Sequence, residues 1–142
     1  MAIYALGEHE PDIHPEAFIH PEAVIIGRVR VGAHSSVWPG AVIRGDDGDV
    51  IVGARTSIQD GAVLHTTHEH FTTVGDDCVI AAGAVVSRDI PGGTVAAGIP
   101  ARPICTIDEY WERNAAQFSH IHRRPNAEKR RLLLERFRLP PG

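Results

Sequence analysis

The sequence has few of the residues that often hold a small protein together. It contains two cysteines, Cys78 and Cys105, and a single methionine, and aromatic residues make up 6% of its 142 positions. Two cysteines are too few for a disulfide framework, and their spacing excludes a Cys-x-x-Cys redox or zinc motif. We therefore expect two reduced thiols, as in a cytoplasmic protein, and a core built from small and β-branched aliphatic side chains.

The sequence also lacks a long apolar run, a basic leader and an excess of positive charge. Its formal net charge is −4, and its basic cluster is confined to the segment 123–138. Nothing in the first residues predicts a signal peptide, and no segment is long and apolar enough to predict a membrane span. We expect a cytoplasmic protein with no membrane partner and no nucleic-acid partner.

What the sequence does contain is a repeat with a period of six. Aliphatic residues recur in three runs, and the position four beyond each is mostly small. The runs are Ile13, Ile19, Ile25, Val31, Val37 and Ile43, then Val52, Ile58 and Leu64, then Val74, Ile80 and Val86. A period of six fits neither an amphipathic helix nor a simple alternating strand.

This period predicts an all-β solenoid, a parallel β-helix. One large side chain per short strand would point inward, and a small residue near each corner would keep the coil narrow. Three hexads would make one triangular turn of about 18 residues, and turns would stack at the inter-strand spacing of about 4.8 Å. The alternative is a β-sandwich in which the spacing is fortuitous.

Two phase shifts interrupt the repeat. Three extra residues lie between Ile43 and Val52, in the segment 44–49, and four extra residues lie between Leu64 and Val74, around His68 and His70. We expect both insertions to form loops, and loops on a rigid scaffold are where binding and catalytic residues concentrate.

The repeat is expected to end at residues 98–103, because the prolines there lack the N–H groups that a ladder needs. Residues 106–109, Thr-Ile-Asp-Glu, predict a capping box. A helix over about 107–121 would then pack along the prism, and a second short helix would run from Asn126 to about Arg138. The sequence thus predicts a repeat domain over 1–104 and a C-terminal helical extension over 105–142.

Two motifs resemble a known family. Arg-Gly-Asp at 44–46 and Gln-Asp-Gly-x-x-x-His at 59–65 are similar to γ-class carbonic anhydrases and their relatives. Residues 66–68 also look like the branch that includes phenylacetate-operon and carnitine-operon proteins. The segments 74–86 and 95–102 resemble hexapeptide-repeat proteins more widely.

The resemblance implies a left-handed parallel β-helix, a homotrimer, and zinc or a similar divalent metal at subunit interfaces. In that family the metal promotes reversible hydration of CO2 to bicarbonate. The resemblance makes His65 a metal ligand and Gln59 a residue that orients substrate, with Asp60 in the same network. Arg44 and Asp46 would form ion pairs at the trimer interface.

The sequence departs from the family at the metal site. The family's other two ligands come from a Gly-His followed by a second histidine, but here no histidine occurs between His70 and His120. Compared with that family pattern, about two coils are missing, those that would hold both ligands. Ser57 also stands where the family often has asparagine.

Other donors lie in the second insertion. His65, His68 and His70 have the spacing His-x-x-His-x-His, and residues i and i+2 of a strand share a face. His68 and His70 could therefore share an ion that His65 or Glu69 completes. The alternative is a solvated corner loop.

Three functions remain open at this point. The first is carbonic anhydrase-like hydration of CO2 by a displaced or shared metal. The second is an acyl-CoA-dependent acyltransferase or thioesterase, in which His65, His68 or His70 is the general base. The third is a non-catalytic trimer that serves as an assembly module.

Overall fold

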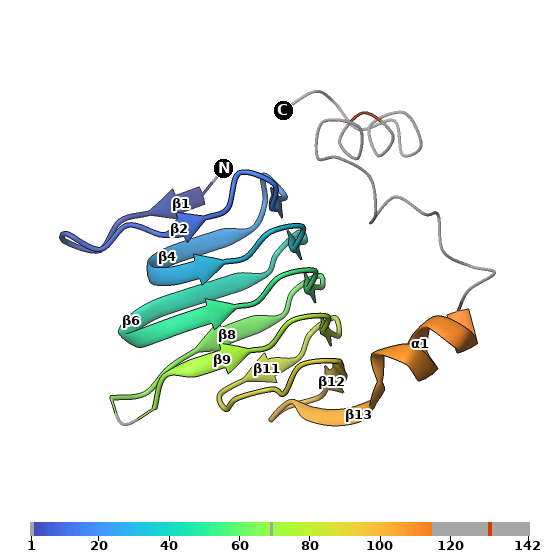
Figure 1. Ribbon diagram of the computed structural model, residues 1–142. Coiled ribbons are helices and arrows are strands. Elements are labelled where there is room, and N and C mark those ends of the chain that lie inside the picture. Colours follow the sequence, from blue (N-terminus) through green and yellow to red (C-terminus); the bar gives the residue numbers. More distant parts are fainter. Residues whose placement is uncertain (1, 69, 115–130, 132–142) are drawn as a thin grey trace.

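The computed structural model describes residues 2–68, 70–114 and 131, and it shows a stack of short strands followed by one helix (Figure 1). The strands form two sheets in which neighbours run parallel, apart from the last strand pair. This arrangement confirms the predicted solenoid, a left-handed parallel β-helix with a C-terminal helical segment. No helix in the described part of the chain is long and apolar enough to cross a membrane.

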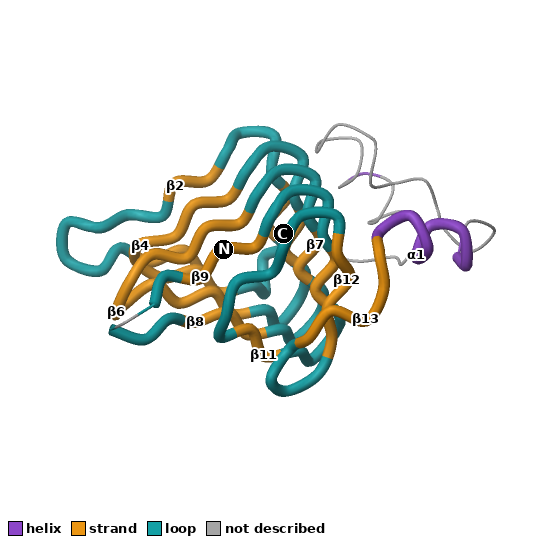
Figure 2. The backbone as a smooth tube through the Cα atoms, turned by 60° about the horizontal axis from the view of Figure 1, so that its bottom comes forward, coloured by secondary structure: helices purple, strands orange, loops and turns teal. Residues whose placement is uncertain are grey.

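The larger sheet covers two faces of a triangular prism, because its two longest strands bend around a corner (Figure 2). It consists of β1 (Ala2–Tyr4), β2 (Asp12–Ile13), β4 (Val24–Val31), β6 (Val42–Val52), β8 (Val63–His65), β9 (Thr72–Val74) and β11 (Val85–Val86). The smaller sheet forms the third face. It consists of β3 (Phe18–Ile19), β5 (Ser36–Val37), β7 (Ser57–Ile58), β10 (Val79–Ile80), β12 (Thr94–Ala97) and β13 (Arg102–Thr106).

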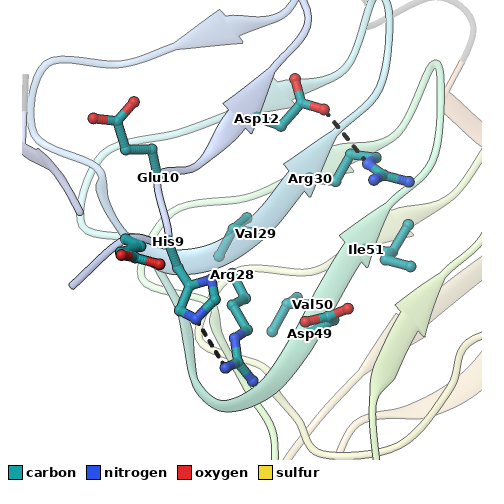
Figure 3. A pocket seen from close by; sticks show the side chains of 10 residues that line it. His9, Glu10, Asp12, Arg28, Val29, Arg30, Asp49, Val50 and Ile51 are labelled. Atoms are coloured by element: carbon teal, nitrogen blue, oxygen red, sulfur yellow. Dashed lines mark hydrogen bonds and ion pairs between the residues drawn. The ribbon is translucent and has the colours of Figure 1, made fainter. Parts of the chain in front are cut away.

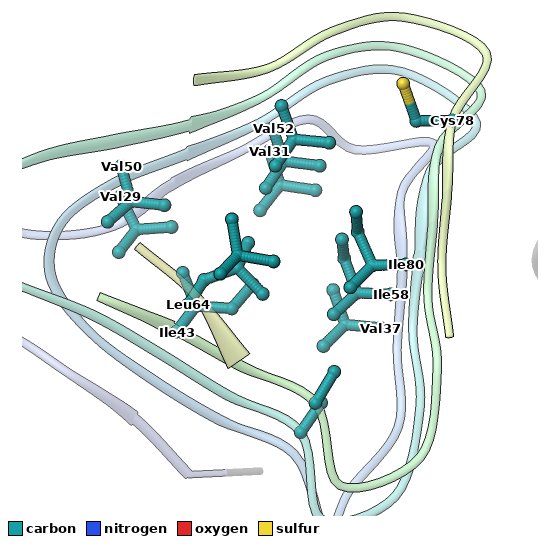
Figure 4. Packing of buried hydrophobic residues seen from close by; sticks show 14 of the residues in the cluster. Val29, Val31, Val37, Ile43, Val50, Val52, Ile58, Leu64, Cys78 and Ile80 are labelled. Carbon is teal, nitrogen blue, oxygen red and sulfur yellow. The ribbon is translucent and has the colours of Figure 1, made fainter. Parts of the chain in front are cut away.

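The repeat positions fill the interior of the prism. Ten of the twelve aliphatic residues identified in the repeat are at most 1% exposed, and Ile13 and Ile19 at the open end are partly buried against the same cluster. Figure 4 shows the side chains stacked in columns, one column for each face, such as Val37, Ile58 and Ile80. Each column is made by residues that are paired in register between successive coils.

At one corner of the prism, residues of successive coils share the left-handed backbone conformation. His34, Arg55 and Asp77 all have positive φ, at 59°, 53° and 55°. Arg55 Nε donates to Asp77 Oδ1 at 2.7 Å, and a second guanidinium nitrogen donates to Asp77 Oδ2 at 3.1 Å. These hydrogen bonds lower the pKa of Asp77. The pair links the corners of adjacent coils.

The first insertion is not a loop. Its residues belong to β6, which pairs with β4 as Gly27↔Gly45 and then as Val29↔Val50. A single residue of β4, Arg28, therefore lies opposite the four residues 46–49 of β6. The three extra residues form a bulge, because the backbone on either side keeps its pairing with the preceding coil.

The end of the repeat also differs from expectation. Residues 102–106 form β13, which adds to the sheet antiparallel to β12 with an irregular register beside Pro103. A proline is tolerated there because β13 is an edge strand and the ladder is locally shifted. The expectation that these prolines end the ladder was wrong, although the parallel coils do stop at β12.

The helix α1 (Ile107–Asn114) begins where the capping box predicted it. The N–H of Glu109 donates to Thr106 Oγ1 at 3.2 Å, and the Thr106 hydroxyl donates to Glu109 Oε1 at 3.2 Å. The described helix contacts β12 and β13 and contains no buried residue, so it does not run along the prism as expected. Its predicted continuation to 121 and the second helix over 126–138 lie outside the described residues, except Arg131.

The interior columns predict where truncation is costly. Ile58→Ala removes a fully buried side chain from the middle of the stack, and we expect it to lower the free energy of unfolding by about 2–5 kcal/mol. Ile51→Ala, an outward and partly exposed position on β6, should cost about 0.5 kcal/mol. Urea denaturation of the two variants checks this order, and equal losses would contradict the assigned register.

The corner ion pair predicts a dependence of stability on pH. Because Arg55 lowers the pKa of folded Asp77, the stabilisation is fully present above the unfolded carboxyl pKa of about 3.9. It is lost as the pH falls through the pKa of folded Asp77. Arg55→Met should therefore be less stable than the unmodified protein at pH 6, and the difference should shrink as the pH falls below the ordinary carboxyl pKa. Chemical denaturation across this range tests the prediction, with exposed Arg88→Met as the control.

Candidate functional site

The solenoid places the two insertions side by side at one corner. The bulge over residues 46–49 belongs to β6, and the turn over residues 66–71 follows β8, the next strand of the sheet. Thr66 Oγ1 donates to the Gly48 carbonyl oxygen at 3.4 Å. Gly48 lies so close to Phe71 that a Cβ on it would be 2.9 Å from Phe71 Cδ1. The bulge and the turn are therefore in direct contact, although about 20 residues separate them in the chain.

His68 lies at the tip of this turn. An antiparallel bridge between Thr67 and His70 closes the turn. The His68 side chain is 85% exposed, and its Nδ1 lies 3.5 Å from Asp47 Oδ1. A carboxylate on the Nδ1 side favours the tautomer whose Nε2 carries the lone pair, and Nε2 then faces solvent. This geometry suits a general base.

Asp47 is itself held by a chain of polar contacts. Its N–H donates to Asp46 Oδ1 at 3.0 Å, and Asp46 Oδ2 lies 3.3 Å from Arg44 Nε. Arg44 thus holds the Asp46 carboxylate, which in turn accepts from the backbone N–H of Asp47. The expected pairing of Arg44 with Asp46 is present within a single chain, and its role at a trimer interface stays a prediction.

His65 occupies a different environment. It ends β8 as the neighbour of Arg44 on β6, and it is partly buried. Its Nδ1 lies 3.5 Å from the Thr66 carbonyl oxygen, and the Thr72 hydroxyl donates to its backbone oxygen at 3.1 Å. His65 is thus fixed against the sheet, whereas His68 and His70 are exposed on the turn.

Gln59 and Asp60 lie at the opposite end of β8. Their backbones form the corner between β7 and β8, where the Gln59 N–H donates to the Ile80 oxygen and the Asp60 oxygen accepts from Gly83. Within one chain, the structure thus separates these two residues from the turn that carries His68. Their predicted roles toward substrate stay predictions.

The predicted metal ligands do not form a site within one chain. Among the described residues, no group of three histidine, cysteine, aspartate or glutamate side chains is close enough to share an ion. His68 Nδ1 lies beside Asp47, whereas His65 Nδ1 lies beside the Thr66 carbonyl oxygen. These residues do not fit the expected zinc ion by themselves, so no step of a reaction is assigned to a metal here.

Cys78 is a core residue, as its place in the repeat predicted. It is 1% exposed, and its Sγ donates to the Pro91 carbonyl oxygen at 3.2 Å. Burial raises the pKa of the thiol. The reactive thiolate is disfavoured, and Cys78 is not a candidate nucleophile.

Two residues of this corner were not identified from the sequence as site residues. Asp47 contacts His68 from the preceding coil, and Phe71, which is 65% exposed, lies against Gly48 of the bulge. The signal for both was their position within the two insertions. The identity of the contact depended on the register between coils, which the sequence pattern alone did not give.

Comparisons with known proteins agree with this architecture. Residues 10–45 match the family described as bacterial transferase hexapeptide, six repeats. The carnitine operon protein CaiE of Escherichia fergusonii is 37% identical over 134 residues, which cover 94% of this chain and 68% of that protein.

Solved structures of hexapeptide enzymes are also similar. A putative acetyltransferase of Bacillus cereus has a TM-score of 0.57 and 29% identity, and the match covers 82% of this chain and 91% of that one. A serine acetyltransferase in complex with cysteine has a TM-score of 0.55 and 26% identity over 68% of this chain and 41% of that one.

None of these comparisons bears out carbonic anhydrase activity, zinc or metal binding, which stay predictions from the sequence motifs. The period of six, the stacked parallel coils and the extent of the match to CaiE lead to one conclusion: the chain belongs to the hexapeptide-repeat transferase family that includes the carnitine operon protein CaiE.

Proposed function

We propose that this protein is an acyl-CoA-dependent acyltransferase in which His68 is the general base and Asp47 orients it. The observation that carries the proposal is the 3.5 Å contact between His68 Nδ1 and Asp47 Oδ1, which leaves Nε2 facing solvent at an exposed corner. A histidine with one nitrogen toward a carboxylate and the other toward substrate is an arrangement that removes a proton from a hydroxyl or amine.

The reaction would proceed by direct attack. His68 Nε2 takes the proton from the acceptor's O–H or N–H group as that atom bonds to the carbonyl carbon of the thioester. The tetrahedral intermediate then collapses, the carbon–sulfur bond breaks, and the imidazolium returns the proton to the departing thiolate of coenzyme A. Asp47 faces Nδ1 and keeps the imidazole oriented through these steps.

The surroundings of His68 support a role in binding as well. Phe71 is 65% exposed at the end of the same turn, and it gives an apolar surface beside a polar base. Such an exposed aromatic side chain is suited to contact the acyl group or the pantetheine arm. The relatives with acetyltransferase descriptions add support from outside the chain.

A homotrimer would place this corner near a neighbouring subunit. The outer face of the larger sheet carries a column of partly exposed valines in register, and they are apolar at positions where a solvated sheet would be polar. The column consists of Val24, Val42, Val63 and Val85. Arg44 and His65 lie on the same face, so a second copy packed on it would approach the candidate site.

Hydration of CO2 and a purely structural role remain the competing functions. A metal would need ligands from a second copy, since the described residues of one chain supply no group of three. Stoichiometric zinc together with CO2 hydration, both lost in His65→Ala, would support the carbonic anhydrase-like function. Absence of metal, of coenzyme A binding and of turnover would support a non-catalytic trimer.

Replacement of the base gives the direct test. With acetyl-CoA and a panel of hydroxyl and amine acceptors, release of free thiol should be acceptor-dependent, and His68→Ala should lower its rate by about 10²–10⁴-fold. Asp47→Asn should have a smaller effect of about tenfold, because the imidazole is retained but loses its charged partner.

The control is His34→Ala, because His34 is an exposed histidine that pairs with Glu16 at another corner. This variant should retain full activity. If His65→Ala or His70→Ala abolishes thiol release while His68→Ala does not, His68 is not the base. If no acceptor leads to release of free thiol from acetyl-CoA, the proposed reaction is contradicted.

The valine column predicts the oligomeric state. Val63→Lys places a charge in the middle of the column while the adjacent inward residue, Leu64, is unchanged. We expect the unmodified protein to sediment as a trimer and this variant to sediment as a monomer. Thr73→Lys, on the exposed outer side of β9, is the control and should stay trimeric. A monomeric unmodified protein at micromolar concentration would contradict the interface.

A further inference from the structure

A second surface feature lies over β2, β4 and β6, beside the N-terminal hairpin (Figure 3). The hairpin is closed by backbone hydrogen bonds between Leu6 and His9, and it projects Glu8, His9 and Glu10 over the outer side of the sheet. The resulting pocket has a volume of about 260 Å³, and its lining includes the strand residues Val29, Val50 and Ile51. This volume suits a small metabolite rather than a macromolecular segment.

Arg28 is the cation available in this pocket. Its guanidinium lies 2.9 Å from His9 Nε2, and because a guanidinium only donates, His9 Nε2 is the acceptor of this hydrogen bond. Within the described residues, no carboxylate forms an ion pair with Arg28, whereas Arg30 lies 3.6 Å from Asp12. Arg28 thus has N–H donors left for an anionic group.

Besides Arg28 and His9, the polar lining contains the ion pair of Arg30 with Asp12 and three further carboxylates. Glu8, Glu10 and Asp49 line the pocket, and none of them has an ion-pair partner among the residues that the structure describes. Asp49 and Arg28 directly precede the paired residues Val50 and Val29, so both signs of charge lie on adjacent strands. A ligand with only anionic groups would face three carboxylates, and a ligand with only cationic groups would face Arg28.

We propose that this pocket binds a small amino-carboxylate of the basic amino acid class, with its carboxylate on Arg28 and its ammonium groups toward Glu10 and Asp49. One unpaired guanidinium and a majority of unpaired carboxylates suit a ligand that carries one negative and two positive charges. Asp49 lies in the same bulge as Asp47, which places the pocket at the corner of His68. The further role of this ligand as acyl acceptor rests on the proposed transferase function, whereas its binding does not.

Three probes of similar length separate the contributions of the charges. L-Lysine carries the carboxylate and both ammonium groups, cadaverine lacks the carboxylate, and hexanoate lacks both ammonium groups. By isothermal titration calorimetry on the full chain, L-lysine should bind about tenfold or more tightly than either comparison probe, as expected for one added charge contact. Arg28→Gln should reduce L-lysine affinity to that of cadaverine, and Asp49→Asn should weaken L-lysine and cadaverine alike.

Arg102→Gln is the matched control, since Arg102 lies on β13 at the far end of the solenoid, and its L-lysine affinity should be unchanged. Circular dichroism of Arg28→Gln verifies that the fold is intact. Equal affinity for the three probes, unchanged L-lysine affinity in Arg28→Gln, or no L-lysine binding up to about 20 mM would overturn the proposal.

A separate measurement distinguishes the pocket from the transferase proposal. If L-lysine binds but is not acylated from acetyl-CoA, the site stands and the acceptor role is lost. If His68→Ala abolishes acylation and leaves L-lysine affinity unchanged, both proposals are supported.

Discussion

The register between successive coils is the constraint on which the rest of the structure depends. Each short strand pairs with the strand one turn away, and its inward aliphatic side chain packs on the equivalent side chains above and below. The same register brings backbone close to backbone at the corners. A Cβ on Gly53 would lie 2.7 Å from the Gly75 backbone, and a Cβ on Gly75 would lie 2.5 Å from the Gly92 nitrogen. Little freedom is left for one coil to shift against another.

That rigidity gives the insertions their chemistry. Extra residues cannot be absorbed within the stack, so they leave it at the corner where they occur. Because both insertions occur at the same corner of neighbouring coils, the bulge and the turn meet, and the carboxylate of Asp47 comes to the imidazole of His68. The N-terminal hairpin adds a second polar surface at the preceding coil, where Arg28 lies opposite the bulge. A repetitive scaffold thus presents residues that are distant in the chain without any change to its core.

The sequence predicted the scaffold more fully than the site. Twelve inward positions followed from a period of six, because one large side chain per strand is a requirement that each hexad meets independently. The capping box at Thr106 was equally local. The insertion at 44–49 was predicted as a loop but forms a bulge in β6, and β13 forms in spite of Pro103. Both outcomes depend on pairing with another coil, which local propensity does not describe.

The site depended on the same non-local pairing. Family resemblance identified Arg44, Asp46 and His65 and gave them roles around a metal. The contact between Asp47 and His68 follows instead from which residues of two insertions face each other, and no motif encodes it. The Arg28 pocket needed the hairpin to fold back over β4, and its residues have no repeat signature of their own.

A crystal structure with coenzyme A bound tests the central claim most directly. If the stacked coils present a transfer site at this corner, the sulfur atom of the cofactor will lie beside His68 Nε2, with Nδ1 still directed to Asp47 and the bulge still in contact with the turn. Coenzyme A held elsewhere on the molecule, or a His68 side chain turned away from both Asp47 and the thiol, would contradict this account.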